Sequence, residues 1–205
     1  VSMDHVRLGR QGVWRRHTVA LLAVALTWTG RPVVVHAQTC ASQPPGLVSW
    51  WRGEGDAADT VGANSGTLQG GTFFTAAEVN QGFTFDSDDD RVVIPHNTNL
   101  NVGGSGFTAE FWMKGIKNQP QSTFVVFEKS HGGGTGWAFQ GDGSTGLLFF
   151  VVGDGSGFPG ASTNTDVLDG SFHHIAGTWD GSTLRLYLDG VLQQSAPLTT
   201  PAGNT

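Results

Sequence analysis

Two short polar stretches of this chain concentrate carboxylate side chains. They are GEGDAAD at residues 53–59 and DSDDD at residues 86–90. Calcium takes carboxylates of this kind in shells of about six to eight oxygens, so the candidate metal ligands are Glu54, Asp56, Asp59, Asp89 and Asp90. A second interpretation is that these Asp side chains cap backbone N–H groups within turns. The stretches therefore predict either a structural calcium site, as the one expected cofactor, or a set of Asp-capped turns.

Aromatic side chains on strand-like segments are the second candidate for chemistry. In FTAEFWMK, Trp112 alternates to the same side as Glu110, and in LRLYL, Tyr187 alternates away from the leucines. Aromatic rings on the outside of a sheet can stack on sugar rings, while Glu110 or His174 bonds hydroxyl groups. The alternative is that both rings pack, because large aromatic side chains are mostly buried. These four residues are the candidate ligand-binding set.

Signatures of catalysis are missing from the sequence. Glu110 is the one acid on its strand, whereas retaining glycosidases place two carboxylates about 5 Å apart. No Gly-x-Ser-x-Gly, His-Glu-x-x-His or phosphate-loop motif occurs. His173 and His174 are adjacent, so on a strand they point to opposite faces and cannot easily share a metal ion. We therefore predict no catalytic residues and no enzymatic activity.

The distribution of charge narrows the range of partners. The 205 residues have a formal net charge of −6, but five of the 11 basic residues and one of the 17 acidic residues lie in residues 1–37. The remainder has a net charge of −10, which repels phosphate backbones and anionic membrane surfaces. We therefore do not expect nucleic acid or a membrane as a partner. The expected partner is an extracellular glycan or a protein ligand.

The N-terminal segment has the layout of a secretory signal peptide over residues 1–37. Basic residues end at Arg16, an apolar stretch runs from Thr18 to about Gly30, and small residues precede a cleavage position after Ala37. The apolar stretch is too short to span about 30 Å of hydrocarbon. The segment predicts export, with the mature protein secreted or at the cell surface.

A short linker, residues 38–46, separates this segment from the expected domain at 47–205. Its two prolines forbid helix and resist sheet pairing. Cys40 is the only cysteine, so the chain can form no internal disulfide. We expect Cys40 to be a leftover thiol, or one paired outside this sequence, rather than a lipid-modified residue.

The hydrophobic pattern beyond the linker has a period of two. Phe107 to Lys114 alternates most clearly, and the continuous apolar run from Leu147 to Val152 indicates a strand covered on both faces. We also expect a strand at Leu47 to Arg52 and a hairpin that joins Phe83–Phe85 to Arg91–Ile94. Roughly ten short strands at regular turn spacing, without a helix, predict an all-β sandwich or jelly roll.

The clearest meander lies between His173 and Gly190. Two alternating runs flank Asp180-Gly181, and Asp189-Gly190 follows the second run. An Asp-Gly pair in this setting predicts a tight hairpin turn, because Gly accepts positive φ angles freely. The leucines of the second run are expected to face the core.

Five segments, in order, resemble the laminin-G-like, concanavalin-A-like jelly rolls of exported bacterial proteins. They are GLVSWWRGEGDAAD, GTLQGG, GFTFDSDDDRVVIP, GFTAEFWMK and HHIAGTWDGSTLRLYLDG. The resemblance covers Leu47 to Pro197 and implies a two-sheet antiparallel sandwich, with calcium often bound near the first loop. The closing strand of that family is not found before Thr205, so we expect a C-terminally truncated fragment of a larger protein with an unpaired sheet edge.

These observations together predict a non-catalytic extracellular binding module for carbohydrate or another ligand. A structural or adhesive domain that contacts proteins is the main alternative, and a polysaccharide-active enzyme is a further one. The fold alone does not separate them, because function resides in sites built on a fold.

Overall fold

The computed structural model describes residues 43–101, 106–117 and 123–202. The described residues from Leu47 onward belong to one compact unit. The predicted signal peptide and Cys40 lie outside the described residues. Within the described ranges, no helix has the length and hydrophobicity needed to span a bilayer.

The first of two four-stranded sheets is built around the predicted meander. Its antiparallel strands are ordered β12-β11-β10-β5. Their bounds are β5 Phe107–Ile116, β10 Asp169–Trp179, β11 Thr183–Leu188 and β12 Val191–Pro197. Burial alternates along β5 and β11 as expected for one face on a core and one toward solvent. Ile175 pairs with Leu188 and Trp179 with Leu184, which confirms the meander.

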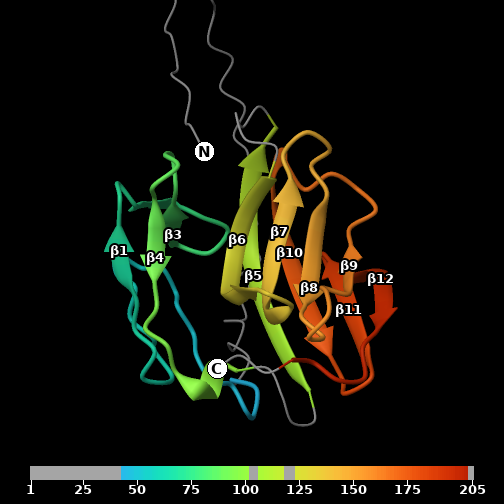
Figure 1. The fold of residues 1–205 in the computed structure, drawn as a ribbon. Coiled ribbons are helices and arrows are strands. Elements are labelled where there is room, and N and C mark those ends of the chain that lie inside the picture. Colours follow the sequence, from blue (N-terminus) through green and yellow to red (C-terminus); the bar gives the residue numbers. More distant parts are fainter. Residues whose placement is uncertain (1–42, 102–105, 118–122, 203–205) are drawn as a thin grey trace, which may run out of the picture. The chain divides into compact units, whose positions relative to one another are not determined.

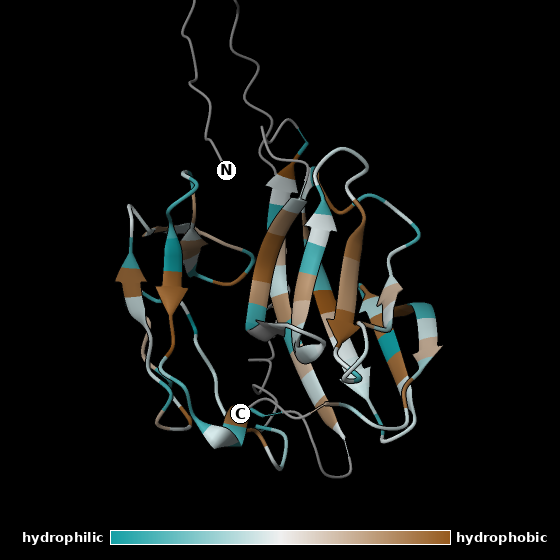
Figure 2. Ribbon diagram, viewed as in Figure 1, coloured by the Kyte–Doolittle hydropathy of each residue, from teal (hydrophilic) through white to brown (hydrophobic). Residues whose placement is uncertain are grey.

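The second sheet has the antiparallel order β6-β7-β8-β9. Its strands are β6 Thr123–Gly132, β7 Thr135–Asp142, β8 Leu148–Val152 and β9 Gly160–Ser162. Figure 2 shows β8 hydrophobic along its length. Leu148, Phe150 and Val152 are fully buried on one face, whereas on the other face Val151 is nearly buried and Phe149 is partly exposed, so the prediction of a strand covered on both faces holds in part.

The hydrophobic core lies between these two sheets. Phe139 and Phe150 of the second sheet stack with ring centroids 4.7 Å apart, and neither is exposed. Ile175 and Leu186 of the first sheet are in the same buried cluster. Figure 1 shows β6, β7 and β8 in front of β10 and β11, as two layers of a sandwich. The predicted all-β, two-sheet antiparallel jelly-roll class is confirmed, with a single short 3-10 turn, η1 (Thr98–Leu100), among the described residues.

Side-chain amides join the two sheets where β9 meets β12. The backbone N–H of Ser162 donates to Oε1 of Gln194 at 2.7 Å, and that of Asn164 donates to Oε1 of Gln193 at 3.1 Å. These contacts replace a backbone ladder between the strands and hold this side of the sandwich together.

The expected hairpin between Phe83–Phe85 and Arg91–Ile94 is wrong. Two separate two-stranded sheets form instead. One pairs β1 (Thr67–Gln69) with β4 (Arg91–Val93), and the other pairs β2 (Phe73–Ala76) with β3 (Gln81–Thr84). The cause is the turn between β3 and β4, where the Asp90 carboxylate accepts N–H groups from Asp86, Ser87 and Gly71. This turn sends the two strands to different partners.

The expected strand from Leu47 to Arg52 is also wrong, because only Trp51 forms an isolated bridge, to Asp59. Its neighbour Trp50 donates its N–H to the Asp59 carboxylate, and its carbonyl accepts the N–H of Thr60 at 3.0 Å. The backbone of this stretch therefore bonds to the following loop rather than to a strand.

Candidate functional site

The solvent-facing side of the first sheet gathers the aromatic and polar side chains that the sequence singled out. His174 lies opposite Trp112 across the β10–β5 pair. Ala176 lies opposite Glu110 on one side and Tyr187 on the other. We define the outer-face patch as Glu110, Trp112, His174, Ala176, Arg185 and Tyr187. All four residues predicted to bind ligand lie in this patch, on three neighbouring strands.

Trp112 presents the largest exposed apolar surface of the patch. Its side chain is 50% exposed, and its ring lies 5.3 Å from that of His174, tilted by 56°. Nε2 of His174 is 3.5 Å from Oε2 of Glu110. An exposed indole beside an imidazole and a carboxylate offers one stacking surface and two hydrogen-bonding groups to the same ligand.

Ala176 and Arg185 complete the patch. Ala176 is its smallest side chain and lies between Glu110 and Tyr187. The Arg185 guanidinium forms an ion pair with Asp180, which orients it at the end of the β10–β11 hairpin. The placement of Ala176 could not be anticipated from alternation, because it depends on strand register.

The Asp189 carboxylate holds the end of this sheet in place. Its Oδ1 accepts the backbone N–H of His174 at 2.8 Å, and its Oδ2 is 2.8 Å from Nδ1 of His173. Asp189 itself has a positive φ of 50° in the turn before β12, a conformation that Asp tolerates better than most residues. The side chains of the adjacent histidines have different partners, Asp189 for His173 and Glu110 for His174, as expected for side chains on opposite faces of a strand.

We expect the stability of the domain to depend on the protonation of His173. Burial opposes its charge, but the Asp189 and Asp169 carboxylates raise its pKa above the ordinary value of 6.5. Protonated His173 therefore stabilises the fold below about pH 6.5, and this contribution is lost as pH rises through the raised pKa. Urea unfolding between about pH 5.5 and 8.5 should show the loss, and His173→Gln should flatten it. Identical pH slopes in the two proteins would contradict the prediction.

Asp59, one of the five candidate calcium ligands, is saturated by backbone donors. Its oxygens accept the N–H groups of Trp50, Val61, Gly62 and Asn64 at 2.9 to 3.0 Å. Burial would raise its pKa, but these four hydrogen bonds together lower it well below the ordinary range. The carboxylate is thus a structural element of its loop.

The other four candidates are not gathered around Asp59 in this structure. Asp56 accepts the N–H of Ala58, Asp89 accepts the hydroxyl of Ser87, and Asp90 caps the turn between β3 and β4. Among the described residues, no three His, Cys, Asp or Glu side chains are close enough to hold a metal ion together. The set of Glu54, Asp56, Asp59, Asp89 and Asp90 is therefore not assembled in this structure.

Four Asp-Gly-Ser turns repeat the same local hydrogen bond. In each, the Asp carboxylate accepts the backbone N–H of the Ser two residues later. The four Asp residues are Asp142, Asp154, Asp169 and Asp180. Their carboxylates are thus used to set turns, which is the second of the two interpretations of acidic, glycine-rich loops.

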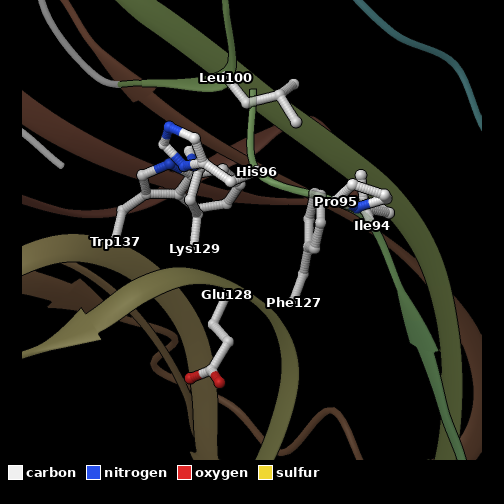
Figure 3. A pocket seen from close by; sticks show the side chains of 8 residues that line it. All are labelled: Ile94, Pro95, His96, Leu100, Phe127, Glu128, Lys129 and Trp137. Carbon is white, nitrogen blue, oxygen red and sulfur yellow. The ribbon is translucent and has the colours of Figure 1, made fainter. Parts of the chain in front are cut away.

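A cavity of about 190 Å³ lies apart from the outer-face patch, and the sequence did not reveal it. Segment 94–100, which follows β4, lines it together with side chains from β6 and β7 (Figure 3). Its lining residues are Ile94, Pro95, His96, Leu100, Phe127, Glu128, Lys129 and Trp137. The sequence did contain one indication of it. Lys129 lies two residues after Phe127, so on a strand both side chains point to the same, core-facing side.

Comparison with known families identifies the class of protein. A family model described as the concanavalin A-like lectin/glucanases superfamily matches residues 86–205, which is more than half of the chain. The chain therefore belongs to this superfamily, as its resemblance in sequence implied. A comparison with curated protein sequences found no match.

Comparison with solved structures found several similar chains. Domain 4 of AbnA, a GH43 extracellular arabinanase from Geobacillus stearothermophilus in complex with arabinotriose, has a TM-score of 0.55 and 16% identity, with 72% of each chain covered. The carbohydrate binding module CBM66 from Bacillus subtilis has a TM-score of 0.43 and 14% identity, covering 68% of this chain and 83% of its own. An S-layer domain-containing protein from Clostridium thermocellum has a TM-score of 0.46 and 17% identity, covering 76% of this chain and 73% of its own. At 16% identity, the likeness to the arabinanase domain is one of fold.

Proposed function

We propose that this chain is a carbohydrate-binding module whose glycan lies on the outer-face patch. The observation that carries the proposal is the half-exposed Trp112 ring next to His174 and Glu110. A sugar ring can stack its C–H face on the indole while its hydroxyl groups reach the carboxylate and the imidazole. The arabinotriose complex of the arabinanase domain supports the same class of ligand on the same fold.

The arrangement of the patch favours a chain of sugars over a single enclosed one. Its residues come from three adjacent strands. The small Ala176 on β10 lies between Glu110 on β5 and Tyr187 on β11, and Trp112 lies two residues further along β5, opposite His174. A flat row of this kind lets an extended oligosaccharide contact both rings in turn. Arg185, held by Asp180, adds a donor for hydroxyl groups beyond the Tyr187 end.

The patch is proposed to bind without catalysing a reaction. It contains one carboxylate, Glu110, whereas hydrolysis of a glycosidic bond in most families needs a pair of carboxylates about 5 to 10 Å apart. Glu110 is also 61% exposed, so its carboxylate is accessible to the hydroxyl groups of a bound glycan. Glycan recognition is thus the role that its position supports.

The proposed setting is an exported protein with further domains. The predicted signal peptide over residues 1–37 and the acidic charge of the remaining chain are the basis for this part of the proposal. An extracellular glycan is the partner that fits, and a protein ligand on the same patch is the competing one.

Trp112→Ala is expected to weaken glycan binding by about tenfold or more, because stacking on an aromatic ring contributes about 1 kcal/mol or more beyond contact area. Binding would be screened on a glycan array and the affinity for the strongest hit measured by titration calorimetry. Ala176→Leu should also abolish binding, since a bulky side chain would stand between Glu110 and Tyr187, in the middle of the patch. Unfolding by urea should show that both variants remain folded.

Trp50 supplies the matched control for this experiment. It is 44% exposed, close to the value for Trp112, and lies outside the patch beside Arg52. Trp50→Ala should leave the affinity unchanged. Equal losses in the two tryptophan variants, or glycan binding that survives Trp112→Ala and Ala176→Leu, would refute the proposed site.

A further inference from the structure

The cavity beside Trp137 contains a buried donor that has no acceptor. Trp137 is 6% exposed, and its Nε1 is closed off from solvent without a hydrogen-bond partner among the described residues. An unpaired buried N–H costs about 1 to 3 kcal/mol, so such groups nearly always meet an acceptor. The ring is fixed by edge contacts to Phe127 and Phe139, with centroids 5.0 and 6.3 Å away, so it cannot easily turn to find one.

Lys129 and His96 place further donors in the same cavity. Lys129 is directly opposite Trp137 in the β6–β7 register, so both side chains lie on the same face of the sheet. Its Nζ is 3.1 Å from Nδ1 of His96. With the ammonium as donor, Nδ1 accepts and the imidazole proton lies on Nε2. Burial lowers the Lys129 pKa, which indicates that its charge lacks a full shell of water.

The lining offers these donors no carboxylate directed toward them among the described residues. Glu128 is the one carboxylate there, and Figure 3 shows it directed away from the group of His96, Lys129 and Trp137. The rest of the wall is apolar and consists of Ile94, Pro95, Leu100 and Phe127. The cavity thus combines three donors, one of them cationic, with a hydrocarbon surface.

We propose that this cavity binds the carboxylate of a small organic acid. One carboxylate oxygen accepts from Lys129 and the other from the indole N–H of Trp137, while the carbon body lies against Ile94 and Leu100. A single negative charge balances the single ammonium. A phosphate dianion would leave a second charge against apolar walls, which is costly. Nε1 of Trp137 is covered in this structure, so a group in the cavity wall must move to expose it as the acid enters. Lys129 has the most rotatable bonds among the donors and is the group expected to move.

This inference is independent of the proposed glycan site. The cavity is lined from β6, β7 and segment 94–100, whereas the outer-face patch lies on β5, β10 and β11. The acid could be a uronic sugar or a plain organic acid, and these sources share the carboxylate that the cavity recognises.

The experiment follows the indole N–H signals of the ¹⁵N-labelled protein during titration at constant ionic strength. The probes are acetate, glucuronate, glucose and inorganic phosphate, and the Trp137 signal is assigned by its loss in Trp137→Phe. We expect a saturable shift of this signal with acetate or glucuronate and none with glucose or phosphate. Saturation by acetate would indicate any small carboxylate, and saturation by glucuronate alone would indicate a uronic sugar.

Variants at two lysines decide whether the shift reports binding in the cavity. Lys129→Met should weaken the interaction by about tenfold or more, while Lys114→Met, on the exposed face of β5, should leave it unchanged. Trp112→Ala should also leave it unchanged, which separates this site from the glycan site. The proposal would be overturned if no carboxylate shifted the Trp137 signal. It would also be overturned if phosphate shifted the signal as much as acetate does, or if acetate shifted it equally in Lys129→Met. Lys129 would then be an inward-pointing charge that protects an edge strand.

Discussion

Gly177→Ala is expected to destabilise the domain by roughly 1 to 3 kcal/mol and to lower its Tm by roughly 3 to 10 °C. A Cβ at this position would lie 2.6 Å from Cζ of Phe139 and 2.7 Å from Cγ of Phe150. Both rings are fully buried and stacked on each other, so neither can move aside without disturbing the core. Gly177 allows the middle of β10 to approach this pair of rings.

Two comparisons make the Gly177 experiment specific. Gly132→Ala adds a methyl group where nothing lies within 4 Å, so it should change the free energy of unfolding by less than about 0.5 kcal/mol. Phe150→Leu should suppress part of the Gly177→Ala effect, with a coupling energy of about 1 kcal/mol in a double-mutant cycle. Additive effects of Gly177→Ala and Phe150→Leu would show that the close approach is not the cause.

Asp59→Ala is expected to cost about 2 to 4 kcal/mol, because it leaves four backbone N–H groups of one loop without their acceptor. Asp59→Asn retains one carbonyl acceptor and should cost less. Since the Asp59 pKa is lower in the folded than in the unfolded state, its stabilising effect is present above the unfolded value of 3.8 and is lost as pH falls toward the folded value. Urea unfolding at about pH 7 and pH 3 measures both effects.

Asp56→Ala is the control for Asp59→Ala, because Asp56 accepts a single N–H in an exposed turn and should contribute below about 1 kcal/mol. Adding calcium or a chelator distinguishes the two interpretations of this loop. If Asp59 acts only as a backbone acceptor, the cost of Asp59→Ala is the same with calcium and with chelator. If the loss of stability caused by Asp59→Ala disappeared in chelator, Asp59 would instead be a calcium ligand.

The strands that could be predicted from the sequence are those that pack directly on the core. β5, β8, β10 and β11 each bury one side or both against the core, so their pattern is visible in a single segment. The hairpin between Phe83–Phe85 and Arg91–Ile94 was mispredicted because short apolar runs fit many partners. The segments that pair with them, β1 and β2, lie in glycine-rich sequence without a strong pattern.

The outward direction of Trp112, Glu110 and Tyr187 could be predicted from period two, whereas their assembly could not. It depends on which residue of β10 stands opposite each, and register is set by the turns and by the buried face together. The cavity was missed for a related reason. Segment 94–100 contains no periodic signal, and it meets Lys129 and Trp137 only through the tertiary fold.

The glutamines that join β9 to β12 also bear on how this protein avoids aggregation. A strand at the border of a sheet presents free N–H groups that can recruit a strand from another molecule. Here Gln194 and Gln193 occupy the N–H groups of Ser162 and Asn164, and β9 is only three residues long. A neighbouring chain therefore finds these donors already used. Replacing both glutamines by alanine would expose them, so two side chains shield this border of the sandwich from the addition of a foreign strand.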